Sequence, residues 1–416
     1  MATIIAILIA SWIWFLGDVN ALNNYPLPTL MNATGLFVLF LSIYLQARGL
    51  NLLQKTEKNF VPRITEIWKH EFFAFLFMAI TFAFPLLSLG LSLPLGFPIT
   101  FQFLVWVILF GLTIDGLLYT LQTMYALVDP FHASHLVEKH AYRSSMTGNI
   151  PEFCQWIESL SDSCIRGIHD ANMGLARSCL TKMDNASQHF IRNNSPLTTP
   201  QNKEEEIIYV ICQILQHFET IHLCADEVRQ EVVASQVVLS LGKLAHNVAK
   251  FFPVVAHLPI NSIGQLAIES VHQGLEEVGT KASLTLQETA KAILEDDPKM
   301  ELPIWDMFRP ILDQLEGIAQ ATFQQNREVN ISTLTKPIRE IRDLFVEGKY
   351  AKHPDAPRIK DAAGNVLATF ETLETVLQTM PHISGQHPPQ KEPEKQEKST
   401  TDEEELNEMR KDILEE

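Results

Sequence analysis

The first 128 residues hold four apolar segments with almost no charge, at residues 2–17, 29–46, 72–95 and 100–120. A helix needs roughly 20 mostly apolar residues to cross the hydrocarbon core of a bilayer. The last three segments reach about this length, whereas the first is short for a full span. The pattern therefore predicts a transmembrane helical domain of about four helices over residues 1–128.

The first apolar segment has two interpretations. It precedes Val19, Asn20 and Ala21, which resemble a signal-peptidase site, but no basic residue comes before it. Residues 1–21 are therefore either a membrane span or a cleaved signal peptide. Both alternatives leave the rest of the chain in the same orientation.

Basic residues indicate which side of the membrane each connection lies on. The stretch between the second and third apolar segments holds every basic residue of this region, namely Arg48, Lys55, Lys58, Arg63 and Lys69. Because basic connections stay in the cytoplasm, we expect both chain termini on the cytoplasmic side. The short spans and connections make the bacterial plasma (inner) membrane the default location.

Beyond residue 128 the apolar positions recur with helical spacing, and strand-like alternation is almost absent. We therefore predict an all-α protein. The expected cytosolic parts are juxtamembrane helices at 129–192, a linker at 193–203 and a helical domain at 204–383.

A short motif recurs in this part, as LGKLA at 241–245, IGQLA at 263–267 and more loosely LEGIA at 315–319. Each copy is expected to open a helix that a second helix follows. The uneven spacing excludes a regular solenoid array and favours an irregular helical-pair bundle or a short α-superhelix. Chance similarity among helices rich in Leu and Ala is the alternative explanation.

The composition changes again near the end of the chain. Residues 384–400 are rich in Pro, Gln, Lys and Glu, which is typical of a disordered linker. Residues 401–416 regain a helical pattern, with Leu406, Met409 and Ile413 on one side of a short acidic amphipathic helix. This helix is either a protein-binding tail or a solvated end.

Charge and cysteine usage narrow the function classes. The net charge of −17 arises after residue 128, because the earlier part holds five basic and five acidic residues. An acidic surface repels phosphate backbones, which argues against nucleic-acid binding. The odd number of cysteines without a CxxC pair indicates reduced thiols in a reducing compartment. These cysteines are Cys154, Cys164, Cys179, Cys212 and Cys224.

Asp115 is the one ionisable residue within a predicted span. Such residues are candidates for an ion or substrate pathway. If the span ends near Tyr119, however, Asp115 lies about one helical turn from the cytoplasmic boundary, and its carboxylate can reach water.

Two histidine clusters are candidates for metal binding. His132, His135 and His140 follow the last span, and the first two share a helix face, but no matching carboxylate or thiol is obvious. Contact with lipid headgroups is the other interpretation. In the second cluster His217, His222 and Cys224 point to different faces, so a buried Cys224 beside a surface His222 is expected.

Short catalytic motifs are absent from the sequence, including the phosphate-binding, dinucleotide, zinc-protease and hydrolase signatures. We expect no cofactor. The leading hypothesis is a multi-pass membrane protein that presents an acidic helical domain as a scaffold or adaptor for a cytosolic protein partner. The alternatives are a transporter or channel component that uses Asp115, and an enzyme that acts on lipid or another membrane substrate. Four spans exceed what anchoring requires, which leaves lipid contact and homo-oligomerisation open.

Overall fold

The computed structural model describes residues 2–16, 26–93, 98–195, 204–297, 300, 302–347 and 349–379. Every regular element in these residues is helical, which confirms the all-α prediction. Most of the predicted linker 193–203 and all of residues 384–416 lie outside the described residues. Contacts divide the chain into two compact units, residues 1–367 and 368–416, and the description below concerns the first.

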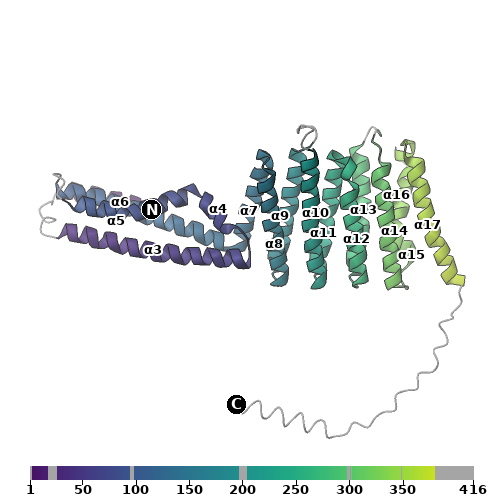
Figure 1. Cartoon of the computed structure of the whole chain (residues 1–416), viewed down its shortest axis with the longest axis horizontal. Helices are drawn as coiled ribbons and strands as arrows, with labels where there is room; N and C mark the ends of the chain where they lie inside the picture. Colours follow the sequence, from purple (N-terminus) through teal and green to yellow (C-terminus); the bar gives the residue numbers. More distant parts are fainter. Residues whose placement is uncertain are drawn as a thin grey trace, which may run out of the picture. The chain divides into compact units, whose positions relative to one another are not determined.

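The described residues up to Val128 form the helices of the N-terminal part, of which α3, α4, α5 and α6 are labelled in Figure 1. The helices of this part are α1 (Ala2–Leu16), α3 (Leu27–Asn59), α4 (Ile64–His70), α5 (Phe72–Ser92) and α6 (Ile99–Val128). The predicted apolar segments lie in α1, α3, α5 and α6. Five helices of the described part are long and apolar enough to cross a membrane, namely α3, α5, α6, α10 and α11.

Contacts between α5 and α6 establish that these two helices run antiparallel. Trp106 Nε1 donates a 2.5 Å hydrogen bond to Ser88 Oγ near the start of α6, and Thr120 Oγ1 contacts the Ala74 carbonyl near its end. The start of α3 shares a small core with Trp106, while its end shares the main core with the end of α6. Helix α3 is therefore parallel to α6 and antiparallel to α5.

The basic stretch after the second apolar segment is largely helical. Helix α3 continues to Asn59, so Arg48, Lys55 and Lys58 lie on its last turns instead of in a loop. A helix of 33 residues is about 50 Å long, against a hydrocarbon core of about 30 Å. The polar end of α3 therefore extends beyond the length that a bilayer core can cover.

Helices α3, α5 and α6 direct many large apolar side chains outward. Only 28%, 22% and 39% of the residues in their most apolar windows are buried. The outward side chains include Phe37 and Phe40 on α3, Phe72, Phe75 and Leu86 on α5, and Leu118 on α6. Soluble monomers rarely expose a contiguous apolar surface of this extent.

The following helices begin directly after α6, with Asp129 as the N-cap that accepts a hydrogen bond from Phe131 N. They are α7 (Pro130–Thr147), α8 (Ile150–His169), α9 (Met173–Asn193), α10 (Glu204–Glu227), α11 (Glu231–Phe251), α12 (His257–His272), α13 (Glu276–Asp296), α14 (Trp305–Gln325), α15 (Ile331–Leu334), α16 (Lys336–Val346) and α17 (Ala356–Thr379). Two 3₁₀ turns, Pro253–Val255 and Lys349–Lys352, interrupt the series.

These helices pack in two rows, with successive pairs side by side (Figure 1). The first row contains α9, α11, α13 and α16, and the second row contains α8, α10, α12 and α14. Side-chain hydrogen bonds between neighbours within a row join residues 43 to 59 positions apart. The partners of α9 on α11 advance in the same direction, from Arg177 with Gln236 to Arg192 with Asn247, so these two helices are parallel.

The recurring Leu-Gly-x-Leu-Ala motif marks helix crossings. Gly242 and Gly264 lie within α11 and α12. A Cβ on Gly242 would collide with Thr285 of α13, and a Cβ on Gly264 would collide with Gln314 of α14. The prediction that each copy opens a helix was therefore wrong, because the glycines permit close approach in the interior of each helix.

Candidate functional site

Asp115 of α6 binds the first turn of α1. Its carboxylate accepts hydrogen bonds from Ala2 N and Thr3 N, both at 2.8 Å, and from Thr3 Oγ1 at 2.7 Å. The first amides of a helix have no intrahelical acceptor, so Asp115 acts as an N-cap supplied by another helix. A Cβ on Gly111, one turn earlier, would touch Ala6, which makes α1 and α6 antiparallel. These contacts give Asp115 a structural role and add no support for a transport pathway.

The three histidines of α7, His132, His135 and His140, face different neighbours. His135 Nδ1 lies 3.2 Å from Glu138 Oε2, and the His140 ring lies 5.2 Å from the Trp156 ring. His132 is exposed. Across the described ranges, no three His, Cys, Asp or Glu side chains gather in a group that could hold a metal ion. The metal hypothesis for this cluster therefore gains no support. The residues predicted for the tail, Leu406, Met409 and Ile413, lie outside the described residues.

His222 is fully buried, contrary to the expectation of a surface residue. Its Nε2 lies 2.8 Å from Ser270 Oγ of α12, and that hydroxyl donates a 2.6 Å hydrogen bond to Asp226 Oδ2. Neither His222 nor Asp226 exposes any side-chain surface. The helical spacing could have predicted that His222 is buried, because it lies four residues after the buried Phe218, on the apolar stripe of α10.

This buried cluster does not have the geometry of a nucleophilic triad. Ser270 and Asp226 both approach the same ring nitrogen, Nε2, while Nδ1 of His222 has no hydrogen-bond partner among the described residues. A catalytic histidine instead binds the nucleophile through one nitrogen and the orienting carboxylate through the other. The cluster therefore links α10 to α12 within the core.

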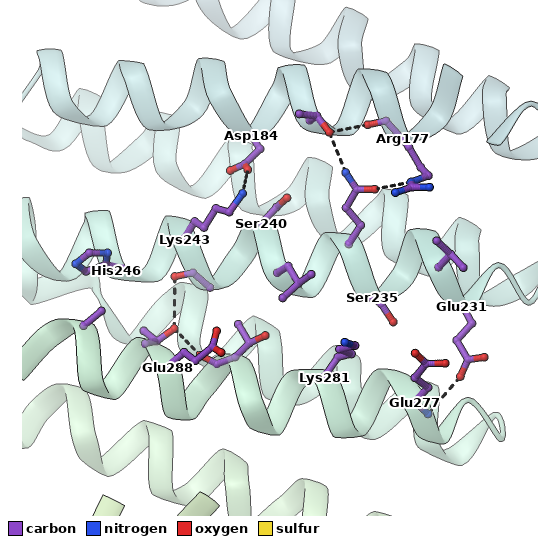
Figure 2. A pocket seen from close by; sticks show the side chains of 18 residues that line it. Arg177, Asp184, Glu231, Ser235, Ser240, Lys243, His246, Glu277, Lys281 and Glu288 are labelled. Atoms are coloured by element: carbon purple, nitrogen blue, oxygen red, sulfur yellow. Dashed lines mark hydrogen bonds and ion pairs between the residues drawn. The ribbon is translucent and has the colours of Figure 1, made fainter. Parts of the chain in front are cut away.

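A groove of about 610 Å³ lies over the first row, across α9, α11 and α13 (Figure 2). Its volume falls within the range of known ligand sites. The residues that line it extend from Arg177 to Ala292 in the sequence, so no local motif could have predicted it. A second groove of about 460 Å³, lined by α13, α14 and α16, shares Glu288 with the first.

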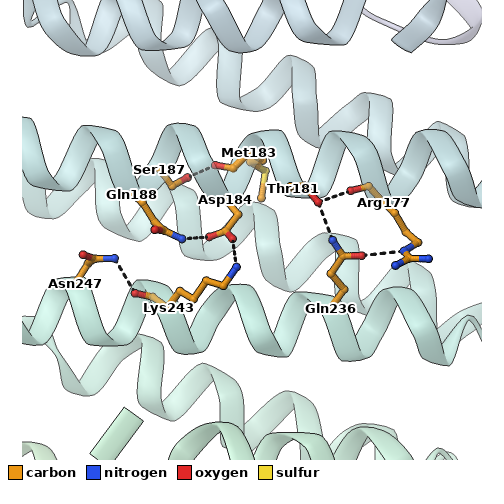
Figure 3. A network of polar contacts seen from close by, with 9 residues as sticks. All are labelled: Arg177, Thr181, Met183, Asp184, Ser187, Gln188, Gln236, Lys243 and Asn247. Atoms are coloured by element: carbon orange, nitrogen blue, oxygen red, sulfur yellow. Dashed lines mark hydrogen bonds and ion pairs between the residues drawn. The ribbon is translucent and has the colours of Figure 1, made fainter. Parts of the chain in front are cut away.

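A polar network holds α9 against α11 along the groove (Figure 3). Asp184 is nearly buried, and its carboxylate accepts hydrogen bonds from Lys243 Nζ at 3.0 Å and Gln188 Nε2 at 2.7 Å. Arg177 Nε donates to Gln236 Oε1 at 3.3 Å. The charges of Asp184 and Lys243 therefore neutralise each other within the wall.

The end of α13 is held to α11 by Asp296. His246 Nε2 lies 2.8 Å from one carboxylate oxygen, and Lys250 Nζ donates to the other at 2.9 Å. Partial burial raises the pKa of Asp296, but hydrogen bonds from Lys250 and His246 outweigh it and hold the pKa below the usual value.

Two buried hydroxyls line the groove between α11 and α13 without a partner. Ser235 Oγ and Thr285 Oγ1 are both inaccessible, and neither makes a hydrogen bond within the described residues. Most buried polar atoms in proteins are paired. The side of the groove between α11 and α13 therefore differs from the side between α9 and α11, where the polar side chains are hydrogen-bonded.

The cysteines provide no reactive thiol within the core. Burial raises the pKa of Cys179 to about 11 and also raises the pKa of Cys164. The nucleophilic form of cysteine is the thiolate, so neither residue is a candidate nucleophile near pH 7. Cys212 is exposed.

No protein-family model, no curated protein and no solved structure matches the chain.

Proposed function

We propose that the protein is a membrane-anchored scaffold that presents a short α-superhelix on the cytosolic side, where the groove over α9, α11 and α13 binds a segment of another protein. The observation that carries the proposal is this groove, which combines the exposed apolar side chains of Val232 and Leu239 with charged side chains on α13 that form no ion pair among the described residues. Rows of paired helices commonly bind peptides along such surfaces.

The outward apolar side chains of α3, α5 and α6 support the membrane part of the proposal. Helices α10 and α11 are also long enough to span, but their mean hydropathies of 1.3 and 1.2 are lower than the 1.6 to 2.3 of α3, α5 and α6, and 44% and 72% of their apolar windows are buried. Helix α10 also begins with three glutamates, and its Asp226 is buried in the core of the stack. We infer that α10 and α11 are apolar because they form the interior of the stack.

The alternating helix directions support a hairpin topology. Helices α1 and α5 run antiparallel to α6, while α3 runs parallel to it. The basic residues Arg48, Lys55 and Lys58 lie at the same end of the bundle as the junction between α6 and α7. Since basic residues stay in the cytoplasm, the stack extends from the cytoplasmic face, by default that of a bacterial inner membrane.

Direct contacts attach the stack to the end of α3. Arg166 of α8 donates to the carbonyls of Glu57 at 2.6 Å and Lys58 at 2.9 Å, which lie in the last turn of α3. Ser159 donates to the Pro62 carbonyl at 2.8 Å. A bundle of four helices can hold the stack in a fixed position, which a single span could not do. This role would account for the additional spans.

Site-specific photocrosslinking in native membranes tests the proposal. A benzophenone amino acid would replace Val232, which is 60% exposed beside the groove, and a matched control would replace Leu223, which is 38% exposed on α10 of the second row. We expect a discrete adduct with a second protein from Val232 and none from Leu223. Equal adducts from both positions, or none from Val232, would contradict a role for the groove.

A further inference from the structure

The groove between α11 and α13 has two walls of different chemistry (Figure 2). Helix α11 contributes Val232 and Leu239, which are exposed apolar side chains two helical turns apart. Helix α13 contributes Glu277, Lys281 and Glu288, whose exposed side chains form no ion pair within the described residues. One wall therefore offers apolar contact, and the other offers an alternation of negative, positive and negative charge.

The two walls are aligned along the groove. Glu231 Oε1 accepts a hydrogen bond from Glu277 N at one end, and Gly242 lies against Thr285 towards the other. Helices α11 and α13 are therefore parallel in this region, and both walls advance in the same direction. A rod-like segment that lay between them would contact Val232 near Glu277 and Leu239 further along.

The charge balance indicates the sign of the occupant. Lys243 is neutralised by Asp184, so it does not attract an anion. Arg177 and Glu231 also line the groove and carry opposite charges, and α13 adds two carboxylates and one ammonium. The lining is therefore negative by one charge, on a chain with a net charge of −17. The groove therefore favours a cationic segment over a phosphate or a carboxylate ligand.

The unpaired hydroxyls between the walls point to a ligand independently of the surface charges. Ser235 and Thr285 are more than nine-tenths buried, and their oxygen atoms have no hydrogen-bond partner in the described part. An unsatisfied buried hydroxyl lowers stability. A hydroxyl that turned towards the groove would gain a partner from a polar side chain of an occupant, which would add a hydrogen bond to the apolar and ionic contacts.

We propose that the groove takes a cationic amphipathic helix of another protein. Its two apolar side chains, seven positions apart, contact Val232 and Leu239. Its basic side chains face Glu277 and Glu288, which are about 16 Å apart along α13, and an acidic side chain between them faces Lys281. This inference rests on the proposed function of the groove as a protein-docking site and names the chemistry of the segment. It follows the helix-in-groove mode of recognition.

Fluorescence anisotropy with defined peptides tests the inference on the full chain in nanodiscs of neutral lipid. The probe is a labelled helical 18-residue peptide with two leucines seven positions apart, flanking lysines and one central glutamate. One control peptide moves one leucine to the opposite face, and another exchanges the lysines and the glutamate for opposite charges. We expect the probe to bind at least tenfold more tightly than either control at low salt.

A double charge reversal, Glu277→Lys with Glu288→Lys, should weaken binding of the probe about tenfold and favour the charge-reversed peptide. The matched control is Glu205→Lys with Glu206→Lys, which makes the same change of net charge in the exposed first turn of α10. This control should alter affinity less than twofold. Equal losses in the two variants would attribute binding to bulk charge and overturn the inference, as would equal binding of the peptide with a displaced leucine.

Mapping of the Val232 adduct separates this inference from the proposed function. An adduct with a cationic amphipathic helix supports both. An adduct with an acidic or extended segment of another protein keeps the docking function and overturns the helix proposed here. An adduct with residues 401–416 of this chain, or with a second copy of it, also overturns the inference.

Discussion

Helices α5 and α11 have the same length, 21 residues each, but α5 directs its apolar side chains outward whereas α11 directs most of them into the core. Helix α5 buries Ala74, Thr81, Phe84 and Ser88 and directs most of its phenylalanines and leucines outward. Helix α11 buries most of its valines and leucines, with Val232 and Leu239 as exposed exceptions, and it exposes Lys243 and Lys250. The apolar composition of a helix therefore does not show whether the helix lies at the surface or in the core. Which of its side chains are buried does show this.

The polar contacts of the two regions differ in their share of charged groups. The N-terminal helices have interhelical hydrogen bonds such as that from Trp106 to Ser88, besides bonds within one helix, whereas the stack adds ion pairs between helices. In the N-terminal helices, Ser42, Thr81 and Thr113 donate to carbonyls four residues earlier in their own helix. In the stack, side chains such as Lys243 and Asp184 join one helix to the next. Small and self-satisfied residues suit packing within lipid, whereas interhelical ion pairs suit an interface reached by water.

The largest predicted effect comes from a charge on the outward apolar face. Leu86 of α5 and Val254 of the stack are 73% and 77% exposed. We expect Leu86→Lys to reduce membrane insertion, because a lysine in the middle of a span costs about 2.5–3.5 kcal/mol. Val254→Lys should change stability by less than about 0.5 kcal/mol. Protease protection of the inserted chain measures the difference, and equal tolerance at both sites would remove the distinction between the two regions.

The next effect concerns the close crossings of the stack. Gly242→Val places side-chain atoms against Thr285, and overpacking of this kind costs about 1–3 kcal/mol. The matched control is Gly364→Val, where a Cβ meets no atom within 4 Å. Thermal unfolding followed by circular dichroism should show a lower midpoint for the first variant and little change for the second. Similar midpoints would mean that α11 and α13 have room to separate.

A smaller effect is expected at the N-cap of α1. Asp115→Ala removes three hydrogen bonds to Ala2 and Thr3, and the loss of a cap costs about 0.5–2 kcal/mol. Maleimide labelling of a chain with Ala2→Cys and Cys212→Ser, which keeps Thr3 and removes the exposed thiol, should therefore become faster in the variant. Thr113→Ala, two residues away, removes a hydrogen bond within α6 alone and should leave the labelling rate unchanged. An unchanged rate in Asp115→Ala would deny the capping role.

The smallest effect is a change in acid sensitivity at Asp296. Because hydrogen bonds hold its pKa below the usual value of about 3.9, its contribution to stability is present above that pH and is lost as pH falls through the folded-state pKa. Asp296→Asn should lower the urea midpoint at pH 7, and the difference from the native chain should shrink towards pH 3. Glu295→Gln, at the neighbouring exposed position, serves as the control. A difference that does not depend on pH would rule out an ionic origin.

Much of the fold follows from periodicity. Apolar positions at helical spacing predicted helices throughout the described part, because a helix that buries one face must repeat that face every three to four residues. The predicted apolar segments lie in α1, α3, α5 and α6. The helices extend beyond the apolar segments, since the second segment ends at residue 46 whereas α3 continues to Asn59. Polar residues extend a helix as readily as apolar ones when the chain has no helix breaker.

Tertiary structure decided what each helix face contacts. Length and hydropathy admit α10 and α11 as candidate spans beside α3, α5 and α6, and packing shows that α11 above all is buried among other helices. The partner of Asp115 lies 112 residues away in Thr3, and His222 contacts Ser270 across 48 residues. The groove joins residues from three helices. The sequence by itself determined that the chain is helical and which residues share a face, because these depend on neighbours within one turn. It did not determine the partners of those faces, because they depend on long-range packing between helices.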